Sequence, residues 1–426
     1  MKVLWLSPSP AGLSAEVNFN FPGGGWITSL ENNLKQIPEI ELAVCFFHYL
    51  PTTFRILHDD VTYYPVYTDL FSLKQKIRSR FFLQLADTNT EGILKAIEDF
   101  KPDVIQVFGT EFGLGEIAEK TNIPLIIHIQ GLLNPIYAAW LPPGISLSTI
   151  HKHASWKNKI LRGGFYHDYK MMEKRAAREE RIIKRCDNFF GRTLWDKSVI
   201  SIYKKTFNYF HCDEMLRSEF YRYEWKMKRN KIIRLVTTIN ESMYKGLEIV
   251  LQTAYLLKSK ANISFEWNIV GMQPGSELAQ LIEKITGLRF QDQCIRFLGP
   301  RIGDDLLKEL LNADLFIHPS YIDNSPNSVC EAQLLGMPVI AGRVGGIPTL
   351  VNNEETGILY NSNDPFELSS IIKDLPNDTP LIKKISRQAR AIALKRHNYE
   401  TITTTVLNTY QMMIKKECKE VLIQIP

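Results

Sequence analysis

Residues 313–364 read ADLFIHPSYIDNSPNSVCEAQLLGMPVIAGRVGGIPTLVNNEETGILYNSND. The pattern predicts an apolar strand over residues 315–318, then a polar loop, a helix and a second strand. Ser325 is a good N-cap and Pro326 a good first helical residue, because proline lacks the N–H that would find no partner there. Gly336 favours the left-handed conformation that ends helices. The stretch therefore predicts a strand–loop–helix–strand unit, the repeating element of an α/β fold.

Polar side chains gather where this helix begins. The first backbone N–H groups of a helix have no partner within it, and with the helix dipole they favour an anion such as a phosphate. Asn327 and Ser328 lie four and three positions before Glu331, so the three share one helix face. Asp323 lies in the preceding loop. The place thus offers amide donors for a diphosphate and two carboxylates for sugar hydroxyls; the alternative is a capped helix with a surface glutamate.

The same alternation of strand and helix runs through the chain. Residues 101–109 (KPDVIQVFG) and 123–131 (IPLIIHIQG) are continuous apolar strands, as a sheet buried on both faces requires. A second series begins with IIRLVTT at residues 232–238, and residues 206–230 between the two series are aromatic and charged with no clean period. We therefore predict two doubly wound, parallel-sheet α/β domains joined by that segment.

Composition bounds the class of protein. A chain of 426 residues with 45% hydrophobic and 23% charged residues is ordinary globular composition, and its length suggests two or three domains. The net charge of +5 favours no particular partner, and the basic residues form no recognised nucleic-acid module. The six cysteines show no metal-binding spacing and are typical of a reducing compartment. No apolar run is long enough for a signal peptide or a membrane span, so a cytoplasmic location is expected.

The polar loop and its surroundings resemble a known family. Asp323 and Glu331 have seven residues between them, and GMPV (336–339) and GGIP (345–348) follow. This pattern resembles the donor site of glycosyltransferase family 4, the glycosyl transferases group 1 of the GT-B enzymes. That family has a glutamate where this chain has Asp323, which keeps the charge but shortens the side chain by one methylene.

The resemblance implies a fold and a division of the chain. GT-B enzymes have two Rossmann-like doubly wound domains that face a cleft, with a final helix that crosses back to the first domain. For this chain we expect an acceptor-side domain, a connection, a nucleotide-sugar-binding domain and a returning helix. The expected bounds are residues 1–205, 206–230, 231–398 and 399–426.

The resemblance also implies an activity. We expect a retaining hexosyltransferase that moves a sugar from a nucleoside diphosphate sugar to a hydroxyl of a glycan or lipid-linked acceptor, in surface polysaccharide assembly. The family needs no cofactor and no metal. Two alternatives stay open: a GT-B epimerase, and a non-catalytic GT-B protein that binds a nucleotide sugar or a partner.

Roles within the donor site follow from the family. Lys245 and the N–H groups of Asn327 and Ser328 are expected to hold the diphosphate, and Glu331 to bind the ribose hydroxyls. Asp323 is expected to bind the sugar hydroxyls, and with Lys245 it is the predicted catalytic pair. The alternative for this lysine is an exposed residue in a turn.

Two features of the phosphate site are less regular. The family usually has an arginine a few residues before the lysine, and this chain has Ile239-Asn240-Glu241 there. Arg343 is a candidate replacement, or else a solvated loop residue. Gly24 and Gly25, in the loop after the first strand, resemble the family's glycine loop near the donor; the alternative is a plain turn.

Residues at predicted strand ends of the first domain are acceptor-side candidates. Gln130 stands where many family members have a histidine; it can bond a sugar hydroxyl but cannot take up a proton, so no general base is assigned. His128, two residues earlier, is expected in the core. Glu111 and Arg192 are predicted acceptor contacts, with structural ion pairing as the alternative.

Residues 145–185 are rich in lysine and arginine, interleaved with Trp156, Phe165 and Tyr166. In the family such a face of the first domain often contacts an anionic membrane, so we include peripheral membrane contact among the expectations. The alternative is a solvated helix with partial charge pairing, because glutamates intervene.

Overall fold

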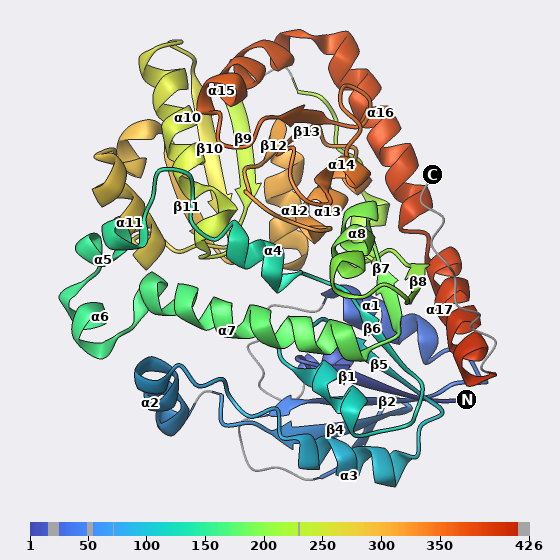
Figure 1. Cartoon of the computed structure of the whole chain (residues 1–426). Helices are drawn as coiled ribbons and strands as arrows, with labels where there is room; N and C mark the ends of the chain where they lie inside the picture. Colours follow the sequence, from blue (N-terminus) through green and yellow to red (C-terminus); the bar gives the residue numbers. More distant parts are fainter. Residues whose placement is uncertain (16–24, 49–53, 71, 229–230, 416–426) are drawn as a thin grey trace. The chain divides into compact units, whose positions relative to one another are not determined.

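The computed structural model describes residues 1–15, 25–48, 54–70, 72–228 and 231–415 (Figure 1). The chain forms two compact units. The first comprises Met1–Tyr137, Tyr169–Arg217 and His397–Pro426, and the second comprises Ala138–Asp168 and Ser218–Arg396. Each unit is described separately below.

The first unit contains an eight-stranded sheet in the order β3-β4-β2-β1-β5-β6-β7-β8. Its neighbouring strands run parallel except for the antiparallel pair β3 and β4. The strands are β1 (Lys2–Ser7), β2 (Glu41–His48), β3 (Ile56–His58), β4 (Val61–Tyr67), β5 (Val104–Phe108), β6 (Leu125–His128), β7 (Asn188–Gly191) and β8 (Asn208–His211). The helices are α1 (Gly25–Leu34), α2 (Leu73–Phe82), α3 (Thr90–Phe100), α4 (Leu133–Ala138), α8 (Leu194–Tyr203) and α17 (Tyr399–Ile414).

Both faces of this sheet are buried. Successive side chains of a strand point to opposite faces, and in β1 Val3 and Trp5 join one core while Leu4 and Leu6 join the other. The first core is covered by α1 and α17, and the second by α3, α8 and the long helix α7 (Gly164–Arg185). This explains why the strands read as continuous apolar runs rather than as alternating ones.

The C-terminal helix α17 belongs to the first unit. Its Tyr410 hydroxyl accepts a hydrogen bond from the Trp5 indole at 3.1 Å and donates one to the Gln106 side chain. These polar groups are all buried, so the helix is fixed to β1 and β5 by both packing and hydrogen bonds.

The second unit contains a six-stranded, all-parallel sheet in the order β11-β10-β9-β12-β13-β14. The strands are β9 (Ile233–Thr238), β10 (Phe265–Val270), β11 (Ile295–Gly299), β12 (Leu315–His318), β13 (Val339–Gly342) and β14 (Ile358–Tyr360). Helices α10 and α15 pack together, as do α13 and α16 (Figure 1). The helices are α5 (Leu147–His153), α6 (Trp156–Leu161), α9 (Glu219–Arg222), α10 (Leu247–Ser259), α11 (Glu277–Thr286), α12 (Gly303–Asn312), α13 (Asn327–Leu335), α14 (Ile347–Leu350), α15 (Pro365–Asp374) and α16 (Thr379–Arg396).

The predicted fold class, two α/β domains built on parallel sheets, is confirmed. The bounds of the units differ from the expected ones in two places. Residues 138–168 cluster with the second unit, and the expected connection at 206–230 contains β8, an edge strand of the first sheet. Among the described residues no helix combines the length and the apolar character needed to cross a bilayer.

Candidate functional site

The carboxyl ends of β9 and β12 meet where the strand order of the second sheet reverses. From β9 the chain moves outward to β10 and β11, and it returns on the other side of β9 as β12, β13 and β14. Open α/β sheets bind ligands at such a switch point. Lys245 follows β9 and Asp323 follows β12, so the topology brings these two predicted residues to one edge.

Glycines allow the loops at this edge to approach each other. Gly246 has φ 73°, and a Cβ there would lie 2.2 Å from the carbonyl oxygen of Pro319. A Cβ on Gly345 would lie 2.1 Å from the carbonyl oxygen of Asp323, which also accepts the N–H of Gly346 at 2.9 Å. Gly246 and Gly345 therefore allow the close backbone contacts that position the loop with the Asp323 carboxylate.

Lys245 and Asp323 form a buried ion pair beside His318. The Lys245 ammonium donates to Oδ2 of Asp323 at 2.6 Å, and Nε2 of His318 lies 3.1 Å from the same oxygen. The side chains of the lysine and the aspartate are 15% and 17% exposed. Such a pair is held by charge-assisted hydrogen bonding, which is stronger than a neutral contact.

Both members of the ion pair are charged at neutral pH. Burial by itself raises the pKa of Asp323, but the Lys245 ammonium and the His318 imidazole outweigh it and hold that pKa well below its usual range. Burial likewise lowers the pKa of Lys245, but the Asp323 carboxylate more than reverses this and raises it above its ordinary value. The site therefore presents a permanent cation at the switch point.

Helix α13 begins one residue later than predicted. Pro326 is the N-cap and not the first helical residue, because its backbone is extended (φ −70°, ψ 121°) while its carbonyl accepts the N–H groups of Val329 and Cys330 at 3.0 and 3.2 Å. The buried Ser325 hydroxyl lies 3.8 Å from the Cys330 sulfur. The helix ends at Gly336 with φ 76°, as expected.

The other predicted donor residues lie on the first turns of α13. Asn327 and Ser328 are its first two residues and are half-buried, so their N–H groups are among those without an intrahelical partner. The Asn327 side-chain oxygen is buried and, among the described residues, has no hydrogen-bond partner. Glu331, one turn further, is 6% exposed. Its expected contact with ribose stays a prediction.

The first sheet reverses its order between β1 and β5, and acceptor-side candidates lie at the carboxyl ends there. Gly25 is the first residue of α1, while Gly24 lies outside the described residues. Glu111 follows β5, and Gln130 follows β6 and is half-buried.

Glu111 occupies a space that glycines leave open. A Cβ on Gly109, which has φ 80°, would lie 1.9 Å from its carboxylate, and a Cβ on Gly131 would lie 3.2 Å away. The Gly131 N–H donates to Oε1 at 3.0 Å. Burial raises the pKa of Glu111 to about 7, although this N–H works in the opposite direction. Glu111 is thus a half-buried carboxyl that changes protonation near neutral pH.

Arg192 and His128 are core residues. Arg192 is buried beneath Trp26, 4.3 Å from the ring centroid, and its Nε lies 3.5 Å from the Glu214 carboxylate. This arrangement matches the ion pairing that the sequence left as the alternative for Arg192. His128 contacts Trp26 and Phe190, and burial holds its pKa well below the ordinary value, so it is a packed neutral histidine.

The basic residues of α7 are partly paired. Arg181, Lys184 and Arg185 form ion pairs with Glu116, Glu180 and Glu119 respectively. This is the charge pairing of a solvated helix. The aromatic residues of the segment differ among themselves, since Phe165 is buried whereas Trp156 is 75% exposed.

The family match lies in the second unit. A sequence model of the glycosyl transferases group 1 matches residues 230–378. The D-inositol 3-phosphate glycosyltransferase of Corynebacterium diphtheriae is 36% identical over 103 residues, which cover 24% of this chain and 23% of that protein. Sulfoquinovosyl transferase SQD2 of Arabidopsis thaliana is 24% identical over 328 residues, 74% of this chain and 58% of that protein.

Solved structures match both units. Sucrose-phosphate synthase from Thermosynechococcus elongatus aligns with a TM-score of 0.69 over 98% of this chain and 100% of its own, at 15% identity. Anabaena Alr3699/HepE in complex with UDP-glucose aligns with a TM-score of 0.63 over 96% and 99%, at 17% identity. At such identities the likeness concerns the fold.

Residues 230–378 thus match the glycosyl transferases group 1, and the chain has the fold of the GT-B glycosyltransferases. The two acidic positions of the donor-site pattern are Asp323 and Glu331 in this chain, with the shorter side chain at the first position. His318 was not among the site residues predicted from the sequence. A histidine at the carboxyl end of a strand next to a switch point is a signal that would have drawn attention to it.

A second buried carboxyl, that of Glu248, lies three residues after Lys245 in the chain. Glu248 is in the first turn of α10, and burial raises its pKa to about 7, although the neighbouring Tyr321 hydroxyl works in the opposite direction. The ordinary value is 4.5. Between these two values the folded state keeps a proton that the unfolded state releases, so the free energy of unfolding falls as the pH rises and levels off above pH 7.

We expect Glu248→Gln to remove this dependence. As the pH rises from 4.5 to 8, the difference in unfolding free energy between the variant and the wild type should change by up to about 3 kcal/mol in favour of the variant. Urea unfolding at both pH values measures the gain, with the exposed Glu355→Gln as the control. Glu111 contributes a similar slope in both proteins, so the difference isolates Glu248. A difference that does not change with pH would contradict the assignment.

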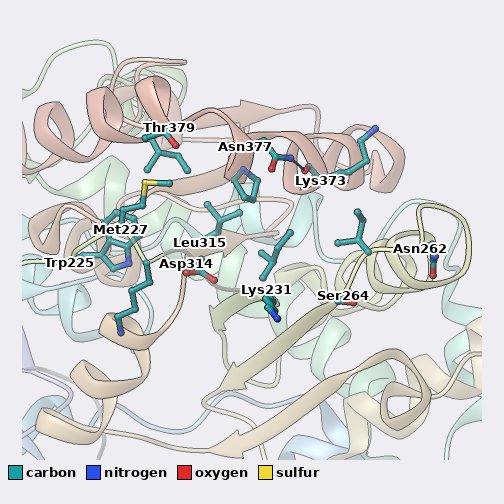
Figure 2. Close-up of a pocket in the computed structure, with 15 residues that line it drawn as sticks. Trp225, Met227, Lys231, Asn262, Ser264, Asp314, Leu315, Lys373, Asn377 and Thr379 are labelled. Carbon is teal, nitrogen blue, oxygen red and sulfur yellow. Dashed lines mark hydrogen bonds between the residues drawn. The ribbon is translucent and has the colours of Figure 1, made fainter.

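A pocket of about 540 Å³ opens at the other edge of the second sheet, by the amino ends of β9 and β12 (Figure 2). Two of its charged groups already have partners. Asp314 accepts the Arg234 N–H at 2.8 Å, and Lys228 donates to the Leu311 carbonyl at 3.1 Å. None of the predicted donor residues lines it. Its lining residues are Trp225, Met227, Lys228, Lys231, Ile233, Asn262, Ile263, Ser264, Asp314, Leu315, Lys373, Pro376, Asn377, Thr379 and Ile382.

Proposed function

We propose that this protein transfers a sugar, with retention of configuration, from a nucleoside diphosphate sugar to a hydroxyl of a glycan or lipid-linked acceptor. This chain matches only part of the length of its sequence relatives, so the activity proposed for the whole chain is argued from the geometry of the site. The observation that carries the proposal is the buried Lys245–Asp323 pair at the switch point of the second sheet, next to the first turn of α13.

The diphosphate is the group that this place suits. Lys245 offers a cation that stays charged, and the N–H groups of Asn327 and Ser328 lie on the helix terminus that favours anions. Solved GT-B neighbours have been crystallised with UDP and with UDP-glucose, which is consistent with a nucleotide-sugar donor here. Glu331 then binds the ribose and Asp323 the transferred sugar.

The chemistry requires charge stabilisation more than proton transfer. When the bond from the anomeric carbon to the diphosphate oxygen breaks, negative charge grows on the diphosphate, where Lys245 and the helix N–H groups act as preorganised donors. These groups fill the role that a metal has in other transferases, so we propose that transfer needs no metal or other cofactor. No covalent nucleophile is assigned.

The acceptor binds at the first unit in this proposal. Glu111 and Gln130 lie at carboxyl ends of adjacent strands and offer hydrogen-bonding groups for a hydroxyl. Assembly of a surface polysaccharide at the cytoplasmic face of a membrane belongs to the same proposal, because a lipid-linked acceptor resides there.

Thermal shift with UDP-, GDP-, ADP- and dTDP-sugars in EDTA tests the donor site. We expect one nucleotide to raise the melting temperature of the wild type, and at least a tenfold weaker affinity in Glu331→Ala, because the variant loses its acceptor for the ribose hydroxyls. A ligand at 100 times its dissociation constant stabilises by about 2.7 kcal/mol, which such an assay detects.

The exposed Glu355→Ala is the matched control and should respond like wild type. Equal shifts in Glu331→Ala and wild type would refute the role of Glu331. No shift with any nucleotide sugar would refute the donor site. A shift without transfer to any supplied acceptor would favour the non-catalytic binding protein.

A further inference from the structure

The pocket shown in Figure 2 lies at the opposite end of the second sheet's strands from the donor site. Its lining includes residues at the amino ends of β9 and β12, whereas Lys245 and Asp323 follow the carboxyl ends of the same two strands. A strand of six residues such as β9 is about 20 Å long, so the pocket is not an extension of the donor site. Its volume of about 540 Å³ is in the range of sites that hold small molecules.

The base of the pocket is apolar. Leu315 of β12 and Ile382 of α16 are buried there, and Met227, Ile233 and Ile263 are half-buried around them. A ligand that covers such side chains removes apolar surface from water, which is favourable. The base of the pocket therefore suits a ligand with an apolar body.

Hydrogen bonds fix the wall of the pocket. Trp225 donates its indole N–H to the Ala313 carbonyl and its backbone N–H to the Leu335 carbonyl, both at 2.8 Å. The Ile233 N–H donates to the Ser264 carbonyl at 3.1 Å. A site whose walls are already held in place needs little ordering when a ligand binds.

Three lysines stand around the apolar base. Lys228 uses two of the three N–H groups of its ammonium within the protein, so one remains for a ligand. Lys373 lies 3.4 Å from the Asp374 carboxylate, and both side chains are exposed. Lys231 is exposed and forms no ion pair with any residue that the structure describes. These cations come from two segments that are distant in sequence.

The first turn of α16 adds to the positive character of the pocket. Thr379 is the first residue of this helix and lines the pocket, and the N–H groups of a first helical turn favour an anion. The Asp378 carboxylate accepts one of these groups, the Leu381 N–H, at 3.0 Å. The acidic lining residue Asp314 accepts the Arg234 N–H at 2.8 Å. The two aspartates are thus engaged by the backbone, and the lysines are left to face a ligand.

We propose that this pocket binds a small molecule that combines an apolar ring system with one anionic group. In Figure 2 Asn377 and Lys373 lie along one side of the pocket, Lys231 and Ser264 along the other, and Leu315 between them. The ring system would cover Leu315, and the phosphate, carboxylate or sulfonate group would lie between the two lysines. This site goes beyond the proposed transfer, because no predicted donor or acceptor residue lines it.

The lining favours such a ligand over a cation or a free sugar. A cation would meet three like charges. A free sugar would place hydroxyl groups against the apolar base, where they would lose their hydrogen bonds to water.

Two fluorescent dyes of similar shape test the proposal on the full chain. One is 8-anilinonaphthalene-1-sulfonate, which carries an anion, and the other is N-phenyl-1-naphthylamine, which carries none. Lys231→Gln/Lys373→Gln should weaken binding of the sulfonate about tenfold and leave the neutral dye unchanged. Ser264→Trp fills the pocket and should weaken both dyes at least about tenfold.

Matched variants control for charge and for bulk. Lys383→Gln/Lys384→Gln removes two exposed cations of α16 that do not line the pocket, and Ser201→Trp adds a tryptophan at an exposed serine of α8 in the first unit. Both should bind the two dyes like wild type. Competition of the sulfonate dye with 2-naphthyl phosphate and with 2-naphthoate then shows whether the site prefers a phosphate or a carboxylate.

Four results would overturn the proposal. The wild type could fail to bind the sulfonate dye, or Ser264→Trp could bind it as tightly as wild type, which would place the dye elsewhere. The lysine variant could affect both dyes equally or neither, which would exclude recognition of an anion. Neither naphthyl anion could displace the dye. The donor-induced thermal shift should persist in every pocket variant, so failure here is separate from failure of the donor site.

Discussion

Replacing Lys245 by alanine is expected to lower the rate of sugar transfer by about 100- to 1,000-fold, the usual effect of removing one preorganised donor from a developing oxyanion. Lys245 donates to Asp323 at 2.6 Å, so the position of its ammonium is set by the protein itself. Its side chain is largely withdrawn from water, which strengthens its interaction with a diphosphate.

The division between kcat and KM distinguishes this role from simple binding. The charge on the diphosphate grows as the glycosidic bond breaks, so the loss should fall mainly on kcat rather than on KM. Initial rates with the donor found by thermal shift measure both. Lys245→Arg keeps the charge and should retain more activity than the alanine variant, and the exposed Lys260→Ala should behave like wild type. An unchanged kcat in Lys245→Ala would show that Lys245 does not stabilise the transition state.

The sequence predicted the second unit more closely than the first. The strand at residues 315–318 and the helix end at Gly336 agree with the structure, because apolar runs and a C-terminal glycine are local signals. Strand β8 was hidden in the aromatic, charged segment 206–230. It is a short edge strand with half-exposed side chains, and such strands show no clear apolar pattern.

The orientation of helix α2 illustrates a different limit. Its alternating apolar and basic residues are visible in the sequence, but a helical period does not reveal which face meets the core. That choice depends on the hydrogen bond from Gln75 to Gln84 and on the caps at Ser72 and Leu83. Only the folded chain shows that the apolar face is exposed.

Within the donor site, spacing predicted which residues gather but not how they pair. The spacing of seven residues between Asp323 and Glu331 indicated that the first lies on a loop and the second on a helix. The contacts of Asp323 with Lys245 and His318 depend on the paths of two loops, which Gly246 and Gly345 allow to meet. The pKa of Glu111 likewise depends on the glycines around it, which are distant in sequence.

Removing the Asp323 carboxylate is expected to lower stability as well as activity. Asp323→Ala leaves the Lys245 ammonium buried without its partner, and breaking a buried ion pair from one side costs about 3–5 kcal/mol. Asp323→Glu keeps the charge and restores the residue type of the family, so it should recover most of that loss, less the cost of fitting one extra methylene. Urea unfolding at pH 7 measures the difference.

The cycle with Lys245→Met separates pairing from burial. If the pair is the cause, the double variant Lys245→Met/Asp323→Ala should be more stable than the sum of the single losses predicts, because no uncompensated charge remains.

The pH dependence of stability gives an independent check on the pair. The folded state holds the pKa of Asp323 below its ordinary value, so the contribution of the carboxylate is complete above that value and is lost as the pH falls through the lower one. Asp323→Ala should therefore lack the part of the acid destabilisation that wild type shows below about pH 4. Two results together would mean that Asp323 and Lys245 do not act as a pair. The losses of the single variants would add up in the double variant, and Asp323→Ala would lose as much stability at acid pH as the wild type does.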